Sequence, residues 1–315
     1  MSEYRLPNFI VVGAAKSGTT SIYQYLKQHE DVFMSPIKET HFFSSDIDSK
    51  KFRKDYAAAL NKDLTAYVNG PMDKEIFHAF VTDFEIYKKL FKNAGTKKAI
   101  GEVTNSYLYS KDAAKNIRNT IPDAKVIMIL RNPVERIFSH YLMDIRSGVE
   151  QLPFRQAVDK DMNKNPKGWG ISNVYVEIGM YADQVERYIS QFPGDQLKII
   201  LFDDFKKDAK AVMESVFNFL EISPNTDIDF NVRYNKAFIP KSKLIGKLNA
   251  QRKLKLAVKN IVPQSVKSFF KKTFYTDKNL PKLSSNDKSW LIELYRNDIS
   301  RLSGLLNRDL SDWLK

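Results

Sequence analysis

The segment FIVVGAAKSGTTSIYQYLKQH, residues 9–29, is the most informative part of this sequence. Its first four residues, Phe9–Val12, are apolar and predict a buried strand. A turn of Gly, Ala, Ser and Thr follows, and then Ile22, Tyr23 and Leu26 recur at helical spacing. A strand, a small-residue turn and a helix in this order predict a loop that holds phosphate with backbone N–H groups at the helix N-terminus.

The lysine of this loop is not where a nucleoside-triphosphate loop has it. In the pattern G-x-x-x-x-G-K-[ST], the lysine follows the second glycine and the next hydroxyl residue holds magnesium. Here Gly13 and Gly18 keep the spacing, but Thr19 follows Gly18 and the lysine, Lys16, lies inside the loop. The loop can therefore bind an oxyanion, but it lacks the residues that handle a triphosphate with its metal.

Length and composition favour one globular domain over residues 1–315, with 43% apolar residues to form its core. No apolar run approaches the roughly 20 residues that span a bilayer, and the N-terminus lacks a signal-peptide pattern, so we expect a cytoplasmic protein. The absence of cysteine excludes disulfides and thiolate chemistry. The four histidines have no metal-like spacing and predict no metal site: His29, His41, His78 and His140.

Apolar runs and helical patterns alternate along the chain. Besides Phe9–Val12, strand-like runs occur at Val126–Leu130 and Leu197–Phe202, with helical patterns between them and after residue 282. This alternation predicts an α/β fold, in which a doubly wound parallel sheet is flanked by helices on both faces. Residues 51–95 carry scattered aromatic residues and are expected to form short helices and loops that shape a pocket.

The second informative motif is KVIMILRNPVERIFSHYL, residues 125–142. In a triphosphatase, a later strand ends in an aspartate that supports magnesium. Here the strand ends at Leu130 and delivers Arg131, and Pro133 is placed to begin a helix that carries Ser139. Arginine and a hydroxyl two helical turns later can bind a terminal phosphate. The alternative for Arg131 is a surface ion pair with Glu135, four residues later.

Together these motifs resemble those of sulfotransferases that use 3′-phosphoadenosine 5′-phosphosulfate (PAPS). GAAKSGTTSIYQYL resembles the 5′-phosphosulfate loop, VIMILRNPVERIFSHY the 3′-phosphate loop, and PIKETHFFS the acceptor-side motif of the heparan sulfate and bacterial branch. Further segments match in family order over most of the chain, except about residues 51–91 and 239–280. The resemblance implies a P-loop-like sulfotransferase fold and metal-independent transfer of a sulfuryl group, with adenosine 3′,5′-bisphosphate (PAP) as the product.

The resemblance also implies roles for individual residues. Lys16 would stabilise charge on the leaving phosphate oxygen, and Arg131 and Ser139 would bind the 3′-phosphate. The remaining residues expected to bind PAPS are Ser17, Gly18, Thr19, Thr20 and Ser21 of the loop, Tyr181, and Lys241 and Lys243 of a later basic stretch.

On the acceptor side, Glu39 in KETHFF matches the family's catalytic glutamate and is the expected general base. His41 lies on the same side of an extended segment and is expected to orient Glu39 or to contact the acceptor. Val103 departs from the pattern, because the related heparan sulfate enzymes carry a lysine there. The acceptor is therefore either a glycan hydroxyl, which the motif favours, or a sterol or other lipid hydroxyl, which Val103 and residues 51–91 favour.

Most of the net charge of +13 lies in residues 241–283, which contain twelve basic residues and one acid. Lysines alternate with apolar residues there, so this segment is expected either to cover the nucleotide or to lie on an anionic membrane surface. A nucleic-acid partner is disfavoured because the charge is confined to one stretch with no stacking aromatic platform. A nucleotide kinase is the remaining enzyme alternative, and the positions of Lys16 and Arg131 argue against it. The oligomeric state is left open.

Overall fold

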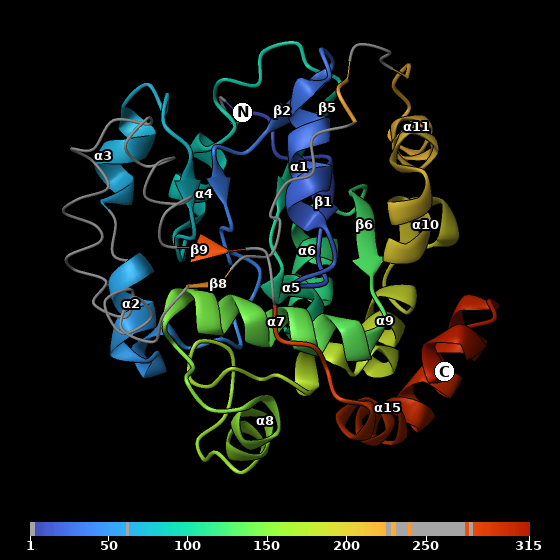
Figure 1. The fold of residues 1–315 in the computed structure, drawn as a ribbon. Helices are drawn as coiled ribbons and strands as arrows, with labels where there is room; N and C mark the ends of the chain where they lie inside the picture. Colours follow the sequence, from blue (N-terminus) through green and yellow to red (C-terminus); the bar gives the residue numbers. More distant parts are fainter. Residues whose placement is uncertain (1–3, 61–62, 225–227, 231–238, 241–274, 277–279) are drawn as a thin grey trace.

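The computed structural model describes residues 4–60, 63–224, 228–230, 239–240, 275–276 and 280–315 (Figure 1). Five parallel strands form the main sheet in the order β2-β5-β1-β6-β7. Their bounds are β1 Phe9–Val11, β2 Val32–Met34, β5 Ala99–Val103, β6 Lys125–Leu130 and β7 Leu197–Leu201. Two short pairs lie apart from it: the parallel pair β3 Ile37–Lys38 with β4 Ile76–Phe77, and the antiparallel pair β8 Ile239–Pro240 with β9 Tyr275–Thr276.

Helices connect and cover the strands (Figure 1). Those that lead into or flank the sheet are α1 Thr19–Gln28, α5 Ser106–Tyr109, α6 Ala113–Thr120, α7 Pro133–Ser147, α9 Tyr181–Ile189, α10 Phe202–Lys207, α11 Ala209–Phe219 and α15 Ser285–Leu306. The others are α2 Lys54–Leu60, α3 Leu64–Asn69, α4 Phe84–Lys89 and α8 Phe154–Met162, with short 3₁₀ turns at Ser49–Lys51, Glu177–Gly179, Gly194–Gln196 and Ser311–Leu314.

The strands bury apolar side chains on both faces. In β1, Ile10 faces a core cluster with α6, α7, α9 and α15, whereas Phe9 and Val11 face a second cluster with α1 and α11. Because side chains alternate along a strand, β1 contributes to both cores and is apolar throughout. The α/β class, the parallel sheet and the helices on both faces are confirmed. The expected strands at residues 9–12, 126–130 and 197–202 are present to within one residue.

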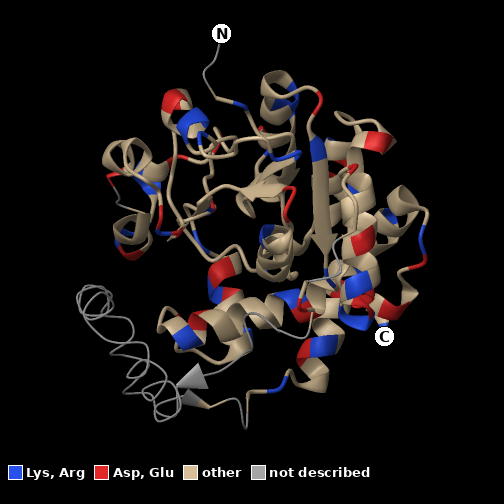
Figure 2. Cartoon of the chain, turned by 90° about the horizontal axis from the view of Figure 1, so that it is seen from above, with Lys and Arg blue, Asp and Glu red and all other residues tan. Residues whose placement is uncertain are grey.

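Charge is distributed mainly over the helices and loops. Lys and Arg lie beside Asp and Glu on the outer elements (Figure 2), in keeping with the nearly balanced charge outside residues 241–283. Most of that basic segment, including Lys241 and Lys243, lies outside the described residues. Its predicted roles over the nucleotide or at a membrane therefore stay predictions. No helix of the described residues combines the length and the apolar character that crossing a membrane would require.

The central strand β5 has a glycine where it passes β1. A Cβ atom at Gly101 would lie 2.2 Å from the Phe9 ring, which is far inside contact distance. We therefore expect Gly101→Ala to lower the free energy of unfolding by about 1–3 kcal/mol or more. Urea denaturation measures this, with Gly194→Ala as the control because a Cβ there meets nothing within 4 Å. Adding Phe9→Leu should restore part of the loss. Equal midpoints for Gly101→Ala and the control would contradict this packing.

Candidate active site

The glycine loop connects β1 to α1 at the carboxyl end of the central strands. Gly18 is the N-cap of α1 with φ of 96°, a conformation that glycine adopts without strain, and a Cβ there would lie 3.0 Å from the Phe202 ring. The Ser17 side chain is fully buried, and its hydroxyl has no hydrogen-bond partner among the described residues. Thr19, Thr20 and Ser21 form the first turn of α1. The loop thus presents donors at a helix N-terminus, as expected for an anion site.

Lys16 is partly buried inside this loop and is surrounded by positive charge. Burial, together with the nearby guanidinium groups of Arg146, Arg131 and Arg136, lowers its pKa to about 8, while Asp144 acts in the opposite direction. Asp144 is itself buried, and it accepts a hydrogen bond from Tyr175 at 2.7 Å. Asp144 and Glu135, the partner of Arg131, do not balance four cations, so the electrostatics favour a multiply charged anion.

Arg131 directly follows β6, and its Nη1 donates to the Lys16 carbonyl at 3.3 Å. Its guanidinium also lies 4.9 Å from the centre of the Phe202 ring and forms an ion pair with Glu135 at 2.9 Å. The structure therefore shows both the placement beside the loop and the ion pair that was the alternative. As predicted, α7 begins at Pro133, with Asn132 as its N-cap. Ser139 is partly buried on α7 and makes no direct hydrogen bond with Arg131.

Tyr181 is the first residue of α9 and is fully buried. Burial raises its pKa, and the charges of Arg136 and Arg131 act in the opposite direction, which places the ring near the guanidinium cluster. The Ser17 hydroxyl lies close enough to the Tyr181 hydroxyl to lower the pKa of Tyr181, although neither group makes a well-formed hydrogen bond among the residues described. Asp298 of α15 accepts the backbone N–H groups of Tyr181 and Ala182 at 2.7 and 3.0 Å, so α15 fixes the start of α9.

Glu39 follows β3 and is 3% exposed. Its carboxylate accepts the Asn105 backbone N–H at 3.0 Å and the Asn105 side-chain amide, and Lys38 Nζ lies 3.3 Å from Oε1. Burial alone would raise the pKa of Glu39, but the Lys38 ammonium, with His78, His41 and the Asn105 hydrogen bond, brings it below its usual value. Glu39 is therefore an ionised carboxylate near neutral pH and can accept a proton.

A second buried carboxylate supports the segment that carries Glu39. Glu102 of β5 is fully buried, and burial raises its pKa although four hydroxyl groups bond to it. The donors are Thr40, Thr104, Tyr87 and Tyr107, at 2.6–2.9 Å. Because Thr40 lies between Glu39 and His41, this network ties the acceptor-side segment to the central sheet.

His41 is buried beside Glu39 with a backbone φ of 59°. Its Nδ1 lies 2.7 Å from Ser106 Oγ, while Nε2 has no hydrogen-bond partner among the described residues. Burial lowers its pKa to about 4, so the ring is neutral at physiological pH. The ring stacks on Phe80 with centroids 5.5 Å apart and meets Trp169 edge-on at 6.0 Å.

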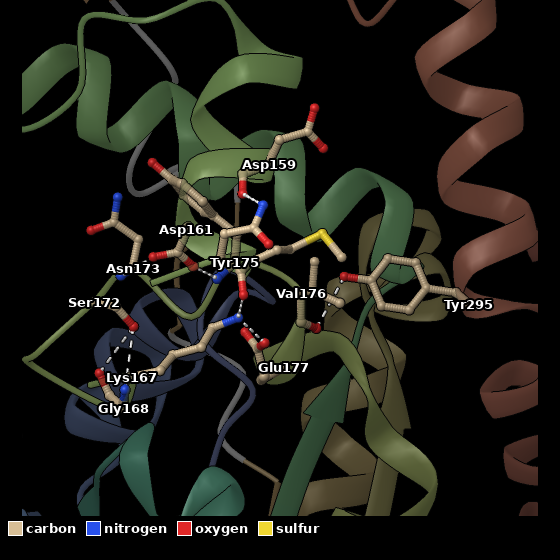
Figure 3. A network of polar contacts seen from close by, with 12 residues as sticks. Asp159, Asp161, Lys167, Gly168, Ser172, Asn173, Tyr175, Val176, Glu177 and Tyr295 are labelled. Carbon is tan, nitrogen blue, oxygen red and sulfur yellow. Dashed lines mark hydrogen bonds and ion pairs between the residues drawn. The ribbon is translucent and has the colours of Figure 1, made fainter. Parts of the chain in front are cut away.

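The loop that brings Trp169 to His41 is held by polar contacts (Figure 3). Asp161 accepts the backbone N–H groups of Asn173 and Tyr175 at 2.7 and 3.0 Å, and Lys167 pairs with Glu177. Trp169 Nε1 donates to the Tyr56 hydroxyl at 3.0 Å, which links this loop to α2. These contacts hold Trp169 in place, so that Trp169 and Phe80 form an apolar wall beside His41.

Several residues of this site were missed in the sequence. Asn105 and Lys38 bind Glu39 directly, and His78 lies close to both Glu39 and His41. Lys38 lies in the KETHFF motif but was given no role there, whereas Asn105 and His78 belong to none of the motifs quoted above. The helical periodicity of residues 133–147 could have identified Arg136 and Asp144. Both lie on the buried face of α7, where a charged residue needs a partner.

A glycine loop surrounded by cations, at the carboxyl end of the strands of a parallel sheet, is typical of a protein that binds an anionic donor. The model of the "Sulfotransferase family" matches residues 7–227. The chain belongs to this family.

Three comparisons illustrate the similarity. The chain is similar to human "Bifunctional heparan sulfate N-deacetylase/N-sulfotransferase 3", with 24% identity over 99% of this chain and 31% of that protein. It is also similar to human "Carbohydrate sulfotransferase 15", with 24% identity over 70% of this chain and 44% of that protein. The chain therefore spans about a third of the length of the first protein and under half of the length of the second. A solved sulfotransferase from Alicyclobacillus acidocaldarius has a TM-score of 0.68 and 27% identity, covering 99% of this chain and all of that one.

Proposed function

We propose that this enzyme transfers the sulfuryl group of PAPS to a hydroxyl acceptor. The observation that carries the proposal is the cluster of Lys16, Arg131, Arg136 and Arg146, whose mutual repulsion contributes to the low pKa of Lys16. PAPS has anionic groups at both its 5′ and 3′ positions, so it would supply the negative charge that this cluster lacks. The buried hydroxyl of Ser17 and that of Tyr181 would also gain an acceptor.

The proposed chemistry is an in-line displacement. The acceptor oxygen bonds to sulfur as the bond from sulfur to the 5′-phosphate oxygen breaks, and Glu39 takes the hydroxyl proton. By analogy with phosphoryl transfer, the protein mainly positions the reactants and stabilises developing charge. Lys16 would stabilise the leaving phosphate, and Arg131 with Ser139 would bind the 3′-phosphate. His41 is proposed to orient Glu39 or the acceptor, since its Nε2 lacks a partner within the described parts of the chain.

The pKa of Lys16 gives this proposal a pH signature. An anion beside Lys16 raises the pKa of its ammonium group, so binding above pH 8 must take up a proton. We expect the affinity for PAP to vary little near pH 7 and to fall up to about tenfold per pH unit above pH 8. Calorimetry at pH 8.5 in buffers of different ionisation enthalpy measures the uptake. Lys16→Met should abolish it, whereas unchanged uptake in that variant would assign the proton to another group.

The acceptor side offers one specific observation. A cavity of about 220 Å³ is lined by Ser49, Phe52, Ala57, Leu60 and Phe80, and Phe80 is the ring that stacks on His41. Val103 is buried in the core cluster that contains α1. The apolar side chains that line the cavity favour an acceptor hydroxyl attached to an apolar group, such as a sterol or lipid. Val103 does not bear on this choice, because its side chain is buried away from any acceptor. A glycan hydroxyl is the second candidate, favoured by the KETHFF motif and by the names of the relatives.

The cavity distinguishes these acceptors experimentally. Ala57→Phe fills it from α2, whereas Ala58→Phe places the same ring at an exposed position one residue later. With sterol, lipid-alcohol and sugar panels, PAPS and mass-spectrometric detection of products heavier by one sulfuryl group, we expect the preferred acceptor to be apolar. Its KM should rise about tenfold in Ala57→Phe and stay unchanged in Ala58→Phe. Exclusive sulfation of sugars, with no effect of Ala57→Phe, would reject the apolar acceptor.

A further inference from the structure

Three potential metal ligands meet at the acceptor side, although the sequence separates them. The strands β3 and β4 pair in parallel, with Lys38 opposite Phe77. The pairing continues beyond them, because His78 N donates to the Lys38 carbonyl at 2.7 Å and Ala79 N to the Glu39 carbonyl at 3.0 Å. This ladder brings His78 beside Glu39 and His41. One carboxylate oxygen and one ring nitrogen from each histidine all lie within 4.8 Å of one another.

We propose that Glu39, His41 and His78 form a binding site for a divalent transition-metal ion such as Zn²⁺, and that the bound ion blocks Glu39 as a base. Two imidazoles and one carboxylate are a ligand set that zinc uses, with bonds of about 2.0–2.2 Å. The ligand atoms must therefore close slightly around the ion. His78 is exposed, so it can adjust and provides the route from solvent.

His41 supplies the independent evidence. The side chain is 1% exposed, and its Nε2 has no partner among the described residues, which is costly for a buried polar atom. Its other ring nitrogen lies 2.7 Å from Ser106 Oγ, and that hydroxyl lies 2.9 Å from Ser44 Oγ. A donor hydrogen on Nδ1 leaves the lone pair of Nε2 free, which is how a metal-binding histidine is usually held.

One neighbouring charge opposes the ion. Lys38 Nζ lies 3.3 Å from Glu39 Oε1 and competes with a cation for that oxygen. We therefore expect reversible binding that is weaker than in a zinc enzyme with a dedicated site. Such binding suits an inhibitory ion, because the apo enzyme keeps Glu39 available.

Zinc titration of the full chain tests the site without reference to activity. Calorimetry should show one saturable equivalent of Zn²⁺, and Co²⁺ should give an absorption spectrum in the same stoichiometry. His78→Asn should weaken both at least tenfold, because asparagine tolerates the positive φ of 65° at this position but is a poor zinc ligand. His41→Gln should do the same. Asp73→Asn, an exposed change five residues earlier, should have no effect.

The activity arm rests on the proposed function, whereas the binding arm does not. Zn²⁺ should inhibit sulfuryl transfer by the wild type. In His78→Asn, half-inhibition should need at least tenfold more zinc, measured relative to the zinc-free turnover of that variant. Unaltered PAP binding verifies the fold of each variant. The proposal is overturned if no saturable site exists, or if both histidine variants bind zinc as tightly as the wild type. If zinc binds as expected but no sulfuryl transfer from PAPS is detected, that result contradicts the proposed function and leaves the zinc site standing.

Discussion

Lys16→Ala is expected to lower kcat/KM at least about 100-fold, because Lys16 is the proposed donor to the leaving phosphate oxygen. The structure places its ammonium group within the glycine loop and under the influence of three guanidinium groups. These groups would still attract the donor, so we expect a larger effect on kcat than on the affinity for PAP. Single-turnover rates and PAP titration separate the two quantities.

Lys27→Ala is the matched control for this change. Lys27 lies in the last turn of the same helix, α1, and pairs with Glu75 at the surface. Its removal should leave turnover within about a factor of two, since exposed ion pairs contribute little. Near-normal turnover by Lys16→Ala would show that the lysine does not act in the reaction.

Glu39→Gln is expected to reduce kcat by about 10²–10⁴, the usual contribution of a general base. Glutamine keeps the shape of the side chain and can still bond to Asn105, but it cannot accept the hydroxyl proton. The affinity for PAP should stay nearly unchanged, because the contacts of Glu39 are to Asn105 and Lys38 on the acceptor side. Stopped-assay turnover and PAP calorimetry on the same preparation test both statements.

Glu221→Gln, an exposed change, controls for the loss of one negative charge. A variant at Glu39 that loses turnover and PAP binding together would indicate that Glu39 holds the structure. That outcome is physically reasonable for a buried carboxylate with an ammonium group beside it, since removing one member of such a pair leaves the other uncompensated. The combined readout is therefore necessary.

The sequence predicted the three strands of the main sheet whose apolar runs are uninterrupted, and it missed the other two strands of that sheet. β5 contains Gly101 and Glu102, which break the apolar pattern. The structure explains both residues, because the Phe9 ring occupies the space of a side chain at Gly101 and four hydroxyl groups satisfy Glu102. β2 has only three residues and offers too short a pattern for prediction.

The residues of the candidate site were likewise predicted only where a local motif contains them. Lys16, Arg131 and Glu39 belong to local motifs, so their neighbourhood in sequence carried the prediction. His78 reaches the site only through the parallel pairing of β3 with β4, and Asn105 through the end of β5. Contacts between distant segments depend on the register of strands, which leaves no local pattern. The predicted roles of Lys241 and Lys243 fall outside the described residues.

Calorimetric titration of the chain with PAP in the absence of divalent metal tests the central claim most directly. The account predicts saturable binding of PAP at one site, weakened by Lys16→Ala and by Arg131→Ala, with much weaker binding of ATP with magnesium. No measurable affinity for PAP, together with tight binding of ATP and magnesium, would contradict it.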